Sequence, residues 1–216
     1  MLLKILSALA LISLLISLIN VVLAFLKWQE KTISGGIIFT YLIVAFGFEA
    51  TSYVLAQEGI NNLFLFHVYA LSEVLLLSFL FAKLPGAWDK PSENLLRWAV
   101  VLLILVNSIF IQKIDTFNSY GLTLSGLVVI FYCVRFFLKM IDMGIAGLEF
   151  HTQKWLVSGI FLAQLVSLVV LFCSNFILSF ERDIQLLVWI SRSLFVLLSK
   201  LIIAYSLIKR FSPAIR

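Results

Sequence analysis

Residues 61–83 read NNLFLFHVYALSEVLLLSFLFAK, an apolar run long enough to cross a lipid bilayer as a helix. The same run contains His67, Tyr69, Ser72 and Glu73. A charged side chain near the centre of a bilayer costs about 3 kcal/mol or more, so it usually faces a partner, a cavity or a transported species. This stretch therefore predicts a membrane-spanning helix, and it makes Glu73 the first candidate for a functional residue.

The composition of the whole chain is typical of a membrane protein. Of the 216 residues, 62% are hydrophobic and 12% are charged. Apolar runs of about 20 residues, the length that crosses a hydrocarbon core about 30 Å thick, alternate with short polar breaks. The sequence predicts a single all-α domain, a bundle of seven transmembrane helices without a soluble domain. The predicted spans cover about residues 5–26, 34–56, 62–83, 95–111, 118–139, 155–178 and 184–208.

Basic residues predict how the bundle is oriented. Eleven Lys and Arg residues fall in the breaks on one side of the seven spans, and three fall on the other. Because cytoplasmic loops carry an excess of Lys and Arg, we expect the N-terminus outside and the C-terminus in the cytoplasm. We expect the plasma (inner) membrane of a bacterium. We attribute the net charge of +5 to these basic residues at the ends of the spans. The lipid bilayer is therefore an expected partner, and nucleic acid is not.

Polar side chains within the spans gather in the predicted outer half, when depth is counted at 1.5 Å per residue. This pattern predicts a polar cavity that opens outward. Tyr69 and Glu73 are four residues apart and share one helix face, and Arg192 is the expected counter-charge of Glu73. A Glu73–Arg192 pair that only fixes helix packing is the alternative interpretation. The candidate ligand-binding or proton-coupling residues are Glu73, Arg192, Glu49, Tyr69, Tyr53, His67, Asn107, Tyr120 and Gln164.

Two further residues are expected to have structural roles. His67 lies six residues from Glu73, on another helix face, and is expected to form a hydrogen bond with a neighbour rather than to relay protons. Lys200 lies about nine residues from the cytoplasmic end of the last span, and a long Lys side chain can extend toward the lipid headgroups.

Three classes of function remain open. The first is a transporter of a small molecule or ion, with a proton-coupled version in which Glu73 changes its protonation state. The second is a seven-helix module that senses a ligand or binds a partner without transport. The third is a membrane-embedded lipid enzyme, which the sequence favours least because catalytic groups are scarce.

Metal and cofactor chemistry is not expected. His67 and His151 lie on different sides of the predicted bundle, and Cys133 and Cys173 lie toward opposite membrane faces, so neither pair forms a metal site. The sequence also lacks the Gly-x-Ser-x-Gly motif of a hydrolase nucleophile. We therefore expect no metal, no cofactor and no catalytic residue, and an enzyme is the less expected class.

Overall fold

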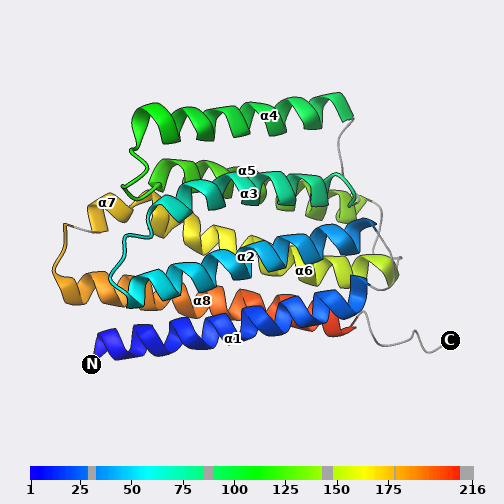
Figure 1. Cartoon of the computed structure of the whole chain (residues 1–216). Helices are drawn as coiled ribbons and strands as arrows, with labels where there is room; N and C mark the ends of the chain where they lie inside the picture. Colours follow the sequence, from blue (N-terminus) through cyan, green and yellow to red (C-terminus); the bar gives the residue numbers. More distant parts are fainter. Residues whose placement is uncertain (29–32, 85–89, 143–147, 178, 210–216) are drawn as a thin grey trace.

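The computed structural model describes residues 1–28, 33–84, 90–142, 148–177 and 179–209, and these parts of the chain are helical apart from short turns. The helices are α1 (Leu2–Trp28), α2 (Ile33–Gln57), α3 (Phe64–Phe81), α4 (Lys90–Val106), the π-helical turn η1 (Asn107–Ile111), α5 (Ser119–Asp142), α6 (Leu148–Phe172), α7 (Ser174–Ile177) and α8 (Arg182–Lys209). Within the described residues, seven helices are long and apolar enough to cross a membrane (Figure 1). The expectation of an all-α chain with seven such helices is confirmed.

Three helix boundaries differ from the predicted spans by about five residues or more, namely the start of α4, which is at Lys90 rather than near residue 95, and both ends of α6. The predicted sixth span extends to residue 178, whereas α6 ends at Phe172 and the short helix α7 follows. The Ser174 hydroxyl, at the start of α7, donates a hydrogen bond of 2.8 Å back to the carbonyl of Leu171 at the end of α6. The break between the predicted fifth and sixth spans, residues 140–154, suggests from its mixture of apolar and charged residues a loop that lies against the membrane interface, but it is largely helical, because α5 continues to Asp142 and α6 begins at Leu148. Residues 143–147 of that loop lie outside the described residues.

The positions of proline and glycine agree with the ends of the helices. A proline in the interior of a helix would remove a backbone hydrogen bond, and the described helices contain none beyond the first turn. Pro91 lies in the first turn of α4, where proline is tolerated. Gly59 follows α2 with φ of +69°, the left-handed conformation that commonly ends a helix. The chain can therefore turn tightly from α2 toward α3.

Six of the long helices form a closed ring. Going round the ring, α1 packs against α2, α2 against α3, α3 against α5, α5 against α6, α6 against α8, and α8 returns to α1. Helix α4 stands outside the ring and packs on α3 and α5, as the separate upper helix in Figure 1 shows. The first and last long helices of the described chain are thus neighbours, and α4 is peripheral.

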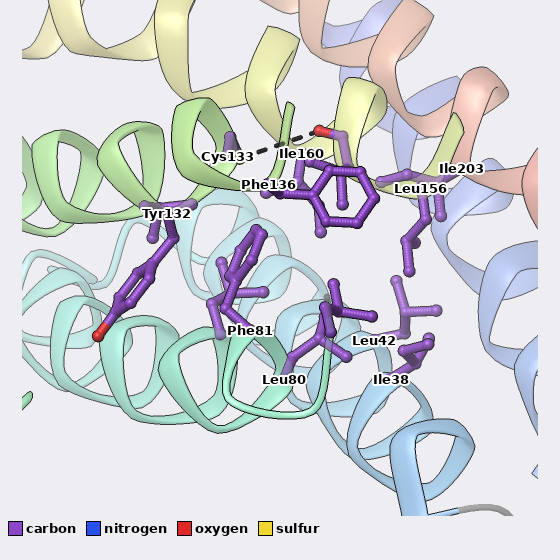
Figure 2. Packing of buried hydrophobic residues seen from close by; sticks show 14 of the residues in the cluster. Ile38, Leu42, Leu80, Phe81, Tyr132, Cys133, Phe136, Leu156, Ile160 and Ile203 are labelled. Atoms are coloured by element: carbon purple, nitrogen blue, oxygen red, sulfur yellow. Dashed lines mark hydrogen bonds between the residues drawn. The ribbon is translucent and has the colours of Figure 1, made fainter. Parts of the chain in front are cut away.

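One end of the ring interior is filled with apolar side chains from all six ring helices. Figure 2 shows members of this cluster from α2, α3, α5, α6 and α8. We call this cluster the apolar plug. It lies at the end of the ring at which α2 begins and α3 ends. Phe81 and Tyr132 stack within it with ring centroids 5.5 Å apart. Its buried members are Ala24, Ile38, Leu42, Leu77, Leu80, Phe81, Leu84, Val129, Tyr132, Cys133, Phe136, Leu156, Val157, Ile160, Ile203 and Leu207.

Candidate functional site

Glu73 lies on α3 directly above the apolar plug, one helical turn from the fully buried Leu77. Only 5% of Glu73 is exposed. Its carboxylate accepts three hydrogen bonds from uncharged donors: the Tyr69 hydroxyl at 2.9 Å, the Gln164 amide at 2.7 Å and the Ser125 hydroxyl at 2.7 Å. Because these donors come from α3, α6 and α5, Glu73 joins three helices of the ring.

The surroundings of Glu73 keep this geometry in place. Gly126 on α5 leaves room for the Gln164 side chain, since a Cβ atom at this glycine would lie 3.2 Å from the Gln164 amide oxygen. The Tyr41 hydroxyl on α2 lies beside that of Tyr69. Tyr69 also packs edge-on against Phe48 of α2, with ring centroids 5.6 Å apart. Helix α2 therefore closes the fourth side of the Glu73 site.

Glu49 forms a second polar site, together with Lys200. The Lys200 ammonium lies 2.7 Å from both carboxylate oxygens of Glu49. The hydroxyls of Ser13 and Ser17 on α1 donate hydrogen bonds of 2.7 and 2.6 Å to the same carboxylate. The site therefore connects α1, α2 and α8, and the Glu49 carboxylate accepts four hydrogen bonds.

The expectation that Lys200 extends toward the headgroups is wrong. Side chains on a helix tilt toward its N-terminus, so a lysine on α8 leans away from the C-terminal end of that helix and toward the middle of the bundle. The Lys200 ammonium also donates to the Ser13 hydroxyl at 2.6 Å, and Asn20 donates to the Lys200 carbonyl at 3.1 Å. Lys200 is thus fixed by α1 as well as by Glu49.

Arg192 lies two turns before Lys200 on α8, within electrostatic range of the carboxylates of both Glu73 and Glu49. Within the part of the chain that the structure describes, Arg192 forms no ion pair with either acid, and its buried Nε has no hydrogen-bond partner. Its guanidinium carbon lies 5.8 Å from the centre of the Trp189 ring. Arg192 therefore supplies positive charge near both acids without being bound directly to one of them.

His67 and Asn107 fasten the turn between α4 and α5 onto α3. One ring nitrogen of His67 lies 2.9 Å from the Ser108 hydroxyl and the other 3.1 Å from the Thr116 carbonyl. The Asn107 amide donates to Gln112 at 3.1 Å and to Asn118 at 2.8 Å. His67 thus forms the hydrogen bonds with neighbours that its position on the helix suggested, whereas the buried side-chain oxygen of Asn107 has no hydrogen-bond partner within the described residues.

Among the described residues, neither the Tyr53 nor the Tyr120 side chain forms a hydrogen bond with Glu49 or Glu73. Tyr53 is half-buried near the C-terminal end of α2. Tyr120 is 52% exposed, and its backbone N–H donates to the Gln112 side chain at 3.0 Å. Of the nine candidate residues, the structure therefore brings together Glu73, Tyr69 and Gln164 by direct hydrogen bonds, with Arg192 and Glu49 nearby.

Sequence reasoning missed the contribution of α1. Ser13, Ser17 and Asn20 are spaced four and three residues apart and share one face of an otherwise apolar helix. This spacing is the signal that could have identified α1 as part of a polar site. Ser125, the third donor to Glu73, carries no comparable signal, since a serine is common in membrane helices.

A cavity of about 650 Å³ lies between α2, α3 and α4, at the end of the bundle where α2 begins and α3 ends. None of the nine candidate residues lines it, so the predicted outward-opening cavity stays a prediction. Groups of three or more His, Cys, Asp or Glu side chains that could hold a metal ion are absent from the described residues.

Comparison with known proteins gives no match to a family model, to a curated protein or to a solved structure.

Proposed function

We propose that this protein is a membrane transporter of a small molecule or ion, and that Glu73 takes up and releases a proton as it works. The observation that carries this proposal is the environment of Glu73, a buried carboxylate that accepts three hydrogen bonds from uncharged donors. No cation touches it within the described residues. Intramembrane acids in such positions commonly serve proton or ion movement.

The contrast with Glu49 supports the choice of Glu73. Both carboxylate oxygens of Glu49 are within 2.7 Å of the Lys200 ammonium, which holds this acid in its charged form. Glu73 has Arg192 only at a distance, so a proton or a cation can bind Glu73 without breaking an ion pair. We therefore assign proton exchange to Glu73 and helix anchoring to Glu49.

The order of layers inside the ring also supports transport. The apolar plug contains buried side chains from all six ring helices and blocks passage at the end where α2 begins. With the N-terminus outside, this end faces the cytoplasm, and the polar layer around Glu73, Glu49 and Arg192 lies above the plug. Such a conformation is closed toward the cytoplasm, and transport requires the plug to open while the outer side closes.

A pH step across proteoliposomes on an electrode-supported membrane tests the proposal without knowledge of the cargo. We expect the wild-type protein to give a transient proton current and Glu73→Gln to give less than about one tenth of it. Glu58→Gln, which alters an exposed acid in the turn after α2, is the matched control and should retain the current.

Equal currents from wild type and Glu73→Gln would remove Glu73 from this role. The absence of any wild-type current, together with co-purification of one specific membrane partner, would favour the sensing module instead.

A further inference from the structure

The cavity between α2, α3 and α4 has no role in the proposed transport. It combines charged groups with apolar walls and lies at the end of the bundle where α2 begins and α3 ends. Its lining residues are Gly36, Ile37, Thr40, Leu76, Phe79, Ala82, Lys83, Glu93, Asn94 and Arg97.

Arg97 is held in a fixed orientation at this cavity. It is only 4% exposed, and its Nε donates to the Ser78 hydroxyl at 2.7 Å. One terminal nitrogen donates to Asn94 at 2.9 Å, the other to the Ser78 carbonyl at 3.4 Å, and the guanidinium lies 4.0 Å from the centre of the Phe79 ring. A guanidinium has five N–H donors, so these described contacts leave two for a ligand.

The charges around the cavity favour an anionic group. Lys83 is exposed at its edge, Arg97 is buried in its wall, and Glu93 is the acid among its lining residues, so the two cations exceed the acid by one charge. Planar arginine and mobile lysine together are a common combination for binding phosphate oxygens. The cavity can therefore hold one phosphate group.

The location of the cavity favours a phosphate that carries acyl chains. Helix α4 lies outside the ring, and its far face is apolar and exposed, with Leu95 at 74%, Trp98 at 57% and Leu102 at 60%. Ile37, Leu76 and Ala82 give the cavity apolar walls beside this helix. Charged groups at the helix ends lie at the depth of lipid phosphates when the bundle crosses a bilayer.

We infer that the groove between α2, α3 and α4 binds a glycerophospholipid, with its phosphate on Lys83 and Arg97 and an acyl chain along the apolar walls. This site is separate from Glu73 and does not depend on the proposed transport. A soluble phosphate compound shares the same recognition chemistry, and the experiment below separates the two sources.

Native mass spectrometry of the delipidated full-length protein in detergent tests the inference. The probes are phosphatidylglycerol, diacylglycerol, which has the chains but no phosphate, and inorganic phosphate, which has no chains. Lys83→Gln removes the exposed cation, and Thr40→Phe fills the cavity from α2 without changing a charge. Lys113→Gln, at an exposed lysine after η1, is the matched control. Arg97 is left intact, because its contacts with Ser78 also support packing.

We expect wild type to bind phosphatidylglycerol in preference to diacylglycerol. Lys83→Gln should weaken this binding about fivefold, the effect of about one phosphate contact, and Thr40→Phe should weaken it further, whereas Lys113→Gln should bind as wild type does. Equal phosphatidylglycerol binding by all four proteins, or diacylglycerol binding as tight as that of phosphatidylglycerol, overturns the inference. Complete displacement of the lipid by inorganic phosphate also overturns it, in favour of a soluble phosphate ligand.

Discussion

The ammonium group of Lys200 lies 2.7 Å from both carboxylate oxygens of Glu49, although 151 residues separate the two in the chain. Glu49 is on α2 and Lys200 is on α8, and each of these helices packs against α1 in the ring. The pair therefore ties together three helices at one point, with Ser13 and Ser17 of α1 completing the carboxylate's contacts.

Removing the cation of this pair should destabilise the protein. We expect Lys200→Met to lower the free energy of unfolding by roughly 3 kcal/mol, toward the lower end of the cost of leaving one member of a buried pair alone. The lower end applies because the Glu49 side chain is 29% exposed. Thermal unfolding of the purified protein in detergent measures the change. The double variant Glu49→Gln with Lys200→Met is the control, and it should recover most of the loss.

Arg192→Gln should affect function more than stability. Since Arg192 forms no ion pair within the described residues, its removal should change the free energy of unfolding by less than about 1 kcal/mol. Arg192 contacts neither Glu73 nor Glu49 directly, but its positive charge lies near both. Because the same change removes this charge, the proton current should be lost. A loss of stability as large as that of Lys200→Met would show that Arg192 has a packing role instead.

Gly159 should not tolerate a side chain. A Cβ atom there would lie 2.7 Å from the Ile203 side chain and 3.0 Å from the Ser199 carbonyl, where α6 and α8 approach each other closely. We expect Gly159→Ala to lower the free energy of unfolding by about 1–3 kcal/mol, the usual cost of overpacking. Gly47 on α2 has no atom within 4 Å of the corresponding position. Gly47→Ala is therefore the matched control and should be at least as stable as wild type.

His67→Ala should loosen the turn that it fastens. Two contacts, to Ser108 and to the Thr116 carbonyl, are lost, each worth about 1 kcal/mol. Hydrogen exchange measured by mass spectrometry should become faster over residues 107–119 and stay unchanged in α6. The proton current should persist. Tyr120→Phe, which alters an exposed ring in the same region, should leave the exchange rates as they are.

The proposed orientation can be tested with single cysteines. Lys113 lies after η1 and Asp142 ends α5, and both side chains are exposed. In right-side-out vesicles, a membrane-impermeant thiol reagent should label Lys113→Cys and not Asp142→Cys, if the N-terminus is outside. The reverse pattern would invert the orientation and place the apolar plug on the outer side.

The sequence predicts the helices well because each is specified locally. An apolar run of about 20 residues without proline has few alternatives to a helix, so all seven long helices overlap their predicted spans. The deviations occur where a helix extends beyond its apolar run, as α6 does at Leu148, and where the apolar run continues past the end of the helix, as it does after Phe172. Local composition alone does not resolve these ends.

The polar sites were harder to predict because they depend on which helices are neighbours. Depth along the helices made Arg192 the expected partner of Glu73, whereas three uncharged donors fill that position. The direction of a side chain matters as much as its depth, since the tilt of Lys200 toward the start of α8 brings it to Glu49. The spacing of Ser13 and Ser17 would have indicated that α1 is the third helix of the Glu49 site.

The closed ring has a consequence for the order in which the protein matures during synthesis. Helices α1 and α2 emerge from the ribosome early, so Ser13, Ser17 and Glu49 are made long before Lys200. Until then Glu49 lacks the cation that it has in the finished fold. The Glu49–Lys200 pair can therefore form only after the last helix is made, and a chain truncated before Lys200 keeps Glu49 without its cation.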